Sequence, residues 1–125
     1  MHYKKDELTL LYNSANSRDI KTLAYAKTIT SKINKQDVNS VTVSATLFKV
    51  MVDKLGGDPK ALINKSLPYY QKNLRGHEYK PKMWLLAIKE MPELLAAPVA
   101  LYHDKVMICN SPTDILKVLN APVRS

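Results

Sequence analysis

The first third of the chain combines two short apolar runs with one amphipathic segment. Residues 8–12 (LTLLY) are rich in strand-forming side chains and precede a polar stretch, which predicts a strand followed by a loop. From Arg18 onward apolar residues recur at helical spacing, and Asn16 or Ser17 can cap the helix. Residues 33–38 predict a second strand, parallel to the first because a helix separates them.

The middle of the chain carries the signals of successive short helices. Ser44 precedes apolar residues at helical spacing, and the glycine pair at 56–57 follows where a left-handed C-terminal turn needs glycine. The Asp-Pro pair at 58–59 repeats a helix start signal, and Pro81 opens a further helix. We therefore expect residues 44–91 to be mostly helical.

The last part predicts a hairpin and a helix. Residues 99–101 and 106–109 are apolar runs separated by a polar segment, which favours an antiparallel hairpin. After it, Asn110 or Ser111 can cap a helix whose first position is Pro112. The element order is strand, helix, strand, then a helical block, then strand, strand, helix, which indicates a small α/β fold.

Length and composition fit one domain. A chain of 125 residues with 46% hydrophobic and 24% charged residues is ordinary globular material. We expect a single domain over 1–125, built from a βαβ unit (8–38), a helical insertion (44–91) and a ββα unit (98–119). No apolar stretch approaches the roughly 18 to 20 residues that span a bilayer. The charged N-terminus does not resemble a signal peptide, so a cytoplasmic location is expected.

Charge and cysteine content narrow the chemistry. The single cysteine, Cys109, excludes an internal disulfide, a CxxC pair and a thiolate metal cluster within one chain. A net charge of +8 suits an acidic partner or a soluble surface with a cationic bias. The lysines are scattered and few aromatics lie between them, so nucleic acid is an unlikely partner.

Three segments in the same order resemble one known family. Residues 8–23 (LTLLYNSANSRDIKTL) resemble the first strand, the Asn-Pro-x-Cys loop and the following helix of the arsenate reductase/Spx family. Residues 55–70 are similar to the segment after that family's third helix. The sequence MPELLAAPVAL resembles the family's His-Pro-x-Leu-x-x-Arg-Pro-Ile motif. The resemblance covers nearly the whole chain. It implies a thioredoxin-like fold with a helical insertion before the C-terminal hairpin.

The resemblance also implies that the catalytic cysteine is missing. Asn16 stands where the family places its nucleophilic cysteine at a helix N-terminus, where free N–H groups and the helix dipole stabilise a thiolate and an oxyanion. The family's oxyanion-binding arginines correspond to Lys65, Ala97 and Asn110, so two of the three positions lose their charge. In the Spx branch the loop holds a CxxC switch, and this chain has Asn16 and Asp19 there.

The degenerate site could still bind a ligand. Backbone N–H groups and the Arg18 guanidinium could hold an anion, a carboxylate or a glutathione-like peptide, although plain helix capping explains the same residues. By resemblance, Pro98 should form a cis peptide bond beside the loop and could present backbone to a thiol peptide. The candidate ligand-binding residues are Asn13, Ala15, Asn16, Ser17, Arg18, Lys65, Ala97, Pro98 and Asn110.

Other residues have simpler explanations. Cys109 lies in an apolar run and is expected to be a small buried hydrophobe, and Trp84 is expected in the core. His77 and His103 form no spaced metal cluster with a third ligand and are expected in surface loops. Aromatic and basic residues interleave in one segment, where a protein partner could dock although at least one tyrosine should be buried: Tyr69, Tyr70, Lys72, Arg75 and Lys80.

These observations leave three hypotheses. The first is a non-catalytic pseudo-reductase that acts as a binding module for a protein or a small anionic or thiol ligand, without a cofactor. The second is an enzyme that handles glutathione or a related thiol without its own nucleophile, using the start of the first helix. The third, a transcription-associated regulator, rests on the Spx resemblance and the charge of +8.

Overall fold

A four-stranded mixed sheet organises the fold in the computed structural model, which describes residues 7–96 and 98–119. The strand order is β2-β1-β3-β4, with β1 and β2 parallel and the other two pairs antiparallel. This is the predicted combination of a βαβ unit and a ββα unit. The strands are β1 (Leu8–Tyr12), β2 (Ile33–Asp37), β3 (Val99–Tyr102) and β4 (Lys105–Ile108).

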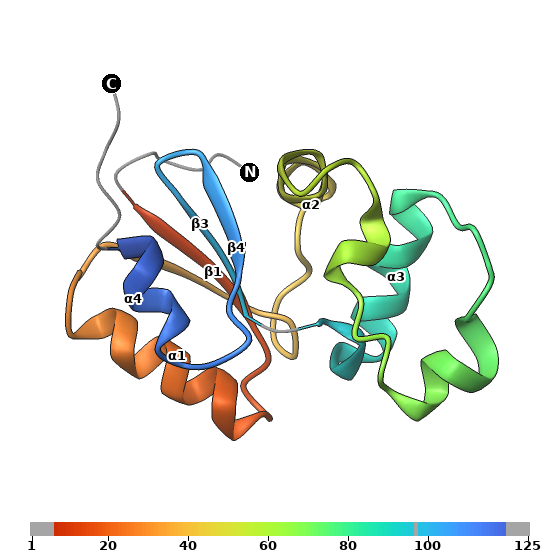
Figure 1. Cartoon of the computed structure of the whole chain (residues 1–125), viewed down its shortest axis with the longest axis horizontal. Helices are drawn as coiled ribbons and strands as arrows, with labels where there is room; N and C mark the ends of the chain where they lie inside the picture. Colours follow the sequence, from red (N-terminus) through yellow and green to blue (C-terminus); the bar gives the residue numbers. More distant parts are fainter. Residues whose placement is uncertain (1–6, 97, 120–125) are drawn as a thin grey trace.

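Two helices cover one face of the sheet. Helix α1 (Ser17–Lys27) and helix α4 (Asp114–Leu119) lie side by side on this face (Figure 1). They bury a hydrophobic cluster in which Leu8 and Leu10 of β1 meet Ile115 of α4. The period-2 alternation of a strand sends these residues to one face and Leu11 to the other.

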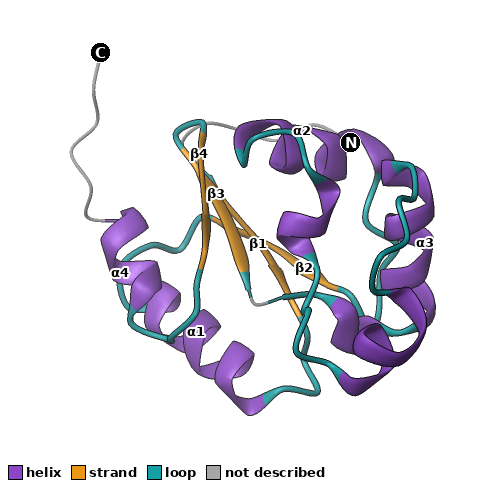
Figure 2. Cartoon of the chain, turned by 45° about the vertical axis from the view of Figure 1, so that its right-hand side comes forward, coloured by secondary structure: helices purple, strands orange, loops and turns teal. Residues whose placement is uncertain are grey.

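The helical block covers the opposite face (Figure 2). It contains α2 (Ala45–Lys54), α3 (Pro81–Glu90) and shorter 3₁₀ and π turns between them and after α3. Phe48 and Trp84 are the largest fully buried side chains of the described residues, and both belong to this cluster. Trp84 is therefore a core residue, as predicted.

The helix start and stop signals are confirmed at three places. The side chain of Asn16 caps α1, and the Ser44 hydroxyl accepts a hydrogen bond from the Leu47 N–H at the start of α2. After α2, Gly56 has a φ of +107° and Gly57 donates its N–H to the carbonyl of Val52.

The C-terminal ββα unit differs in detail from the prediction. Its hairpin turn is confined to His103 and Asp104, both with positive φ, so strand pairing reaches Tyr102 opposite Lys105. The last helix begins at Asp114 rather than Pro112. The reason is local, because the Asp114 N–H donates to the Ser111 carbonyl, three residues back rather than four, so the turn at Pro112 is not α-helical.

One end of the sheet brings distant parts of the chain together. Leu11, near the carboxyl end of β1, lies opposite Val99 at the start of β3, and Val99 lies opposite Ile108 at the end of β4. The Cys109 N–H donates to the Pro98 carbonyl at 2.8 Å and extends this pairing. The loop after β1 therefore lies beside the start of β3. Within the described residues, no helix is long and apolar enough to cross a membrane.

Candidate functional site

The loop between β1 and α1 is held by its own polar groups. The Asn13 side-chain oxygen accepts the Ala15 N–H at 2.9 Å, and the Asn16 N–H donates to the Asn13 carbonyl at 3.0 Å. The Asn13 N–H donates to Oδ2 of Asp19 at 2.9 Å. The polar stretch that follows β1 thus forms an ordered turn rather than an open loop.

Asn16 completes this arrangement as the cap of α1. Its Oδ1 accepts the N–H groups of Arg18 at 2.9 Å and Asp19 at 3.4 Å, and its carbonyl accepts the Ile20 N–H at 3.1 Å. These are N–H groups that an anion would use at a helix N-terminus. Most of the N–H groups here therefore already have acceptors inside the chain, with that of Ser17 the exception among residues 13–20.

The end of β2 supports the loop from behind. Oδ1 of Asp37 accepts the Ser14 N–H at 3.1 Å and the Asn39 N–H at 3.0 Å, and the Asn39 side-chain amide donates to Oδ1 of Asn13. Burial alone would raise the pKa of Asp37, but hydrogen bonds from Ser14, Asn39 and Ser40 outweigh it and lower the pKa to about 2. A carboxylate that is ionised at neutral pH therefore anchors the loop.

Asp19 is a buried acid directly beneath the helix start. Its side chain is almost fully buried, and its Oδ1 has no hydrogen-bond donor among the described residues. The nearest cation is Nε of Arg18, 3.6 Å away. Burial raises the pKa of Asp19, and the Asn13 N–H and the Arg18 charge lower it by less. The Arg18 guanidinium is therefore partly committed to an internal acid.

A second segment pair forms the opposite wall of the site. Ile63 and Leu95 form a β-bridge, and the Asn64 N–H donates to the Leu94 carbonyl at 2.6 Å. Between this wall and the start of α1 lies a cavity of about 460 Å³. Its lining residues are mostly polar: Asn13, Ala15, Asn16, Ser17, Arg18, Asp19, Asn64, Leu67, Glu93 and Leu95.

The structure brings together only part of the predicted site. Asn13, Ala15, Asn16, Ser17 and Arg18 all line the cavity. The remaining candidates are not among its lining residues: Lys65 is exposed beside Asn64, Asn110 is exposed after β4, Pro98 is buried next to Cys109, and Ala97 lies outside the described residues. The expected cis bond between Ala97 and Pro98 lies outside them too.

Sequence reasoning missed half of the cavity lining. Asp19 could have been noticed as the acidic residue in the first turn of a predicted helix. An acid at that position is also explained by its favourable interaction with the helix dipole alone. Glu93 and Leu95 lie in the segment whose motif resemblance drew attention to the later proline. Asn64 and Leu67 flank Lys65, and only the bridge between Ile63 and Leu95 shows which of these side chains face the site.

Cys109 is a sealed hydrophobe, as predicted. Its side chain is fully buried beside the α1 and α4 cluster. Burial, and secondarily the charges of Asp114 and Asp19, raise the pKa of its thiol to about 12. A thiol in this state is neither a nucleophile nor a ready metal ligand at neutral pH.

The segment proposed for partner binding has one buried residue, and its other named residues are exposed. Tyr70 is buried against Trp84, with ring centroids 6.4 Å apart, whereas Tyr69 is exposed. This confirms that one tyrosine of the pair belongs to the core. Lys72, Arg75 and Lys80 are exposed, and their role in partner binding stays a prediction.

The two histidines singled out in the sequence lie in different loops. The described residues hold no group of three or more His, Cys, Asp or Glu side chains able to bind a metal ion. His77 is exposed in its loop, where its ring stacks on that of Tyr79 with centroids 5.5 Å apart. His103 lies in the tight turn between β3 and β4.

Comparison with known proteins identifies the fold. No family model and no curated protein matches the sequence. Among solved structures, a Yersinia pestis protein assigned as an arsenate reductase has a TM-score of 0.74 and 21% identity, covering 89% of this chain and 99% of its own. An arsenate reductase from Vibrio cholerae has a TM-score of 0.68 and 18% identity, covering 92% of this chain and 99% of its own. This chain therefore has the thioredoxin-like α/β fold of these arsenate reductase structures.

Proposed function

We propose that this protein is a non-catalytic pseudo-reductase, a binding module that keeps the ligand cavity of an arsenate-reductase-type fold without the chemistry. The carrying observation is Asn16. It occupies the start of α1 and lines the cavity, and its side-chain oxygen accepts the N–H groups of Arg18 and Asp19 as the cap of the helix. An amide cannot become a thiolate, so the step that begins disulfide or arsenate chemistry in such a fold has no nucleophile here.

Cys109 does not replace the missing nucleophile. It is the single cysteine of the chain, its side chain is fully buried, and its thiol pKa is raised to about 12. Only a vanishing fraction would be thiolate at neutral pH. The absence of an accessible thiol supports a binding role over a reductase with its own redox centre.

The cavity's charges favour a zwitterionic ligand over a bare oxyanion. Arg18 is the cation of its lining, and Asp19 and Glu93 are its acids. A free oxyanion would meet a buried acid and few unused N–H groups at the helix start. A glutathione-like peptide carries carboxylates for Arg18 and an ammonium group for Glu93, so we propose this class of ligand.

An amide NMR titration with reduced glutathione, arsenate and phosphate tests the proposal. We expect saturable shifts with glutathione at Ala15 to Arg18, Asn64 and Glu93, and no such shifts with arsenate or phosphate. The Arg18→Gln variant should abolish the glutathione shifts, and Arg75→Gln, an exposed arginine outside the cavity, should leave them intact. No shifts at millimolar glutathione would contradict the proposed ligand.

Turnover measurements separate this proposal from its main alternative. The position of Arg18 in the cavity also suits an enzyme that orients a thiol cosubstrate, so that the sulfur of the cosubstrate acts as the nucleophile. We expect the purified protein to leave glutathione-dependent reduction of arsenate and of mixed disulfides at the uncatalysed rate. Turnover that Arg18→Ala abolishes would overturn the pseudo-reductase and establish the alternative.

A further inference from the structure

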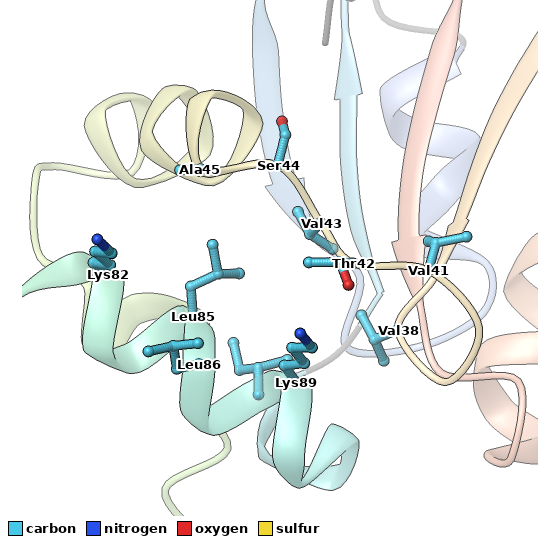
Figure 3. A pocket seen from close by; sticks show the side chains of 11 residues that line it. Val38, Val41, Thr42, Val43, Ser44, Ala45, Lys82, Leu85, Leu86 and Lys89 are labelled. Atoms are coloured by element: carbon cyan, nitrogen blue, oxygen red, sulfur yellow. The ribbon is translucent and has the colours of Figure 1, made fainter.

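Two adjoining apolar cavities lie between α2 and α3, away from the cavity at α1. One has a volume of about 270 Å³ and the other about 390 Å³. Both are lined by Ala45, Lys82 and Leu85, so they form one continuous depression, here called the α2–α3 groove. Figure 3 shows its first half, where side chains of α3 face the segment that leads into α2.

The groove has an apolar floor and exposed apolar edges. Buried Val43, Phe48 and Ile88 line it from below. Val41 and Leu86, at its edges, are 46% and 44% exposed. Large apolar side chains that line a concave surface at this exposure mark a site for an apolar partner group.

The charged residues of the groove are predominantly lysines. Lys80, Lys82 and Lys89 line it, and the structure gives none of the three an ion pair within the described part of the chain. The acid among the lining residues is Asp53, which is paired with Lys49 at 2.9 Å. The groove is therefore apolar at its centre and cationic at its rim.

The spacing of the lysines indicates an elongated ligand. Lys82, Leu85 and Lys89 follow each other at helical intervals, so they form one stripe of α3 that faces the groove (Figure 3). Seven residues of helix separate the two lysines by about 10 Å along the axis. A peptide with several carboxylates can place one opposite each lysine, whereas a single anionic headgroup supplies its charge at one point only.

We propose that the α2–α3 groove binds an acidic amphipathic segment of a partner protein. Apolar side chains of the segment enter the two halves of the groove, and its carboxylates face Lys80, Lys82 and Lys89. This is the helix-in-groove mode, with electrostatic complementarity at the rim. The inference is independent of the proposed ligand at α1, because Asn16, Arg18 and Asp19 do not line the groove.

Fluorescence anisotropy with a defined probe tests the proposal. The probe is a fluorescein-labelled helical peptide with two leucines at positions i and i+4 and glutamates beside them. We expect saturable binding that weakens as salt is raised, because exposed charges are screened. A peptide with lysine for glutamate, and one with serine for leucine, should each bind about tenfold more weakly or worse.

Variants place the binding on the groove. Ala45→Trp should block it, because Ala45 is exposed and lines both halves, and Ala24→Trp on α1 is the matched control. The double variant Lys82→Glu/Lys89→Glu should weaken binding about tenfold by charge reversal. Lys21→Glu/Lys27→Glu, with the same change of charge on α1, should leave binding near that of the parent protein.

Three outcomes would overturn the proposal. The first is acidic-probe binding no stronger than that of the two control peptides. The second is saturable binding of dodecanoate, blocked by Ala45→Trp, without binding of the peptide, which would make the groove a lipid site. The third is a monomer–dimer equilibrium in sedimentation that Ala45→Trp abolishes, which would assign the groove to a second copy of this chain.

Discussion

The cavity at the start of α1 and the α2–α3 groove differ in what they leave unused. At α1, Asn13, Asn16 and Asp37 satisfy the loop's N–H groups from within the chain. In the groove, apolar side chains are exposed, and Lys80, Lys82 and Lys89 have no ion-pair partner in the described part of the chain. The backbone of the family-like site is thus largely satisfied by groups of the chain itself, whereas the groove offers apolar surface and three lysines to a partner.

A ligand at α1 would therefore depend on side chains such as Arg18 and Glu93, whereas a partner at the groove would depend on apolar burial and on the lysines. A polar loop keeps its turn without a ligand when its own side chains accept its N–H groups. An apolar groove gains nothing from its own surroundings until a partner covers it. Four substitutions test how much residues of each region contribute to the free energy of unfolding, and their expected effects decrease in the order given.

Trp84→Ala should cause the largest loss, about 3 to 5 kcal/mol in the free energy of unfolding. Trp84 is fully buried in the core cluster that also holds Phe48 and Ile88, and it contacts Tyr79 edge to face, with centroids 5.0 Å apart. Urea unfolding measures the loss, and the neighbouring exposed Met83→Ala should change stability by less than about 0.5 kcal/mol. Equal effects for both variants would mean that Trp84 is not packed in the core.

Asp37→Ala should destabilise the protein at pH 7 by about 1 to 2 kcal/mol. The pKa of Asp37 is lowered from 3.8 to about 2 in the folded state, so its contribution is present above pH 3.8 and is lost as pH falls through about 2. Urea unfolding at several pH values measures this loss. Asp53→Ala, in an exposed ion pair at the groove, should cost less than about 0.5 kcal/mol, and a larger cost there would reverse the comparison.

Asn16→Ala should cost about 1 kcal/mol through loss of the α1 cap, and Asn16→Ser should recover most of it. The matched change on the groove side is Ser44→Ala, whose hydroxyl caps α2 through the Leu47 N–H. We expect similar losses in urea unfolding, because capping is local to each helix. An unchanged Asn16→Ala protein would show that the loop does not depend on its cap.

Asp19→Asn should have the smallest effect and the opposite sign. Burial raises the pKa of Asp19 above 3.8, so ionising it disfavours the folded state as pH rises through and above that value. The side-chain amide oxygen that this substitution introduces can still accept the Asn13 N–H. We expect wild type and variant to unfold alike below pH 3.8, with the variant more stable at pH 7. A difference that does not vary with pH would exclude this cause.

Local signals predicted the fold well because each is read over a few residues. The caps at Asn16 and Ser44, the Gly56-Gly57 stop and the parallel pair of β1 and β2 all follow from patterns of this kind. The boundaries of β4 and α4 were less accurate, because they depend on the tight turn at His103 and Asp104 and on the i to i+3 backbone hydrogen bond between Asp114 and Ser111.

The candidate site was predicted only on one side. Asn13 and residues 15–18 lie within six positions of the sequence, so a loop motif finds them together. Asn64 and Glu93 come from segments that meet through the bridge between Ile63 and Leu95, and no local pattern encodes that pairing. The groove was missed because Lys82 and Leu85 look like an ordinary amphipathic helix until α2 is placed opposite them.

The strand order of the sheet also determines the order in which its strands can pair during folding. β1 lies between β2, which follows it closely in the chain, and β3, which comes after the whole helical block. Such distant pairing closes slowly, since the entropy of a long loop must be lost first. During synthesis one edge of β1 therefore stays unpaired until β3 has been synthesised. Fragments that end before Val99 should aggregate through that edge rather than fold.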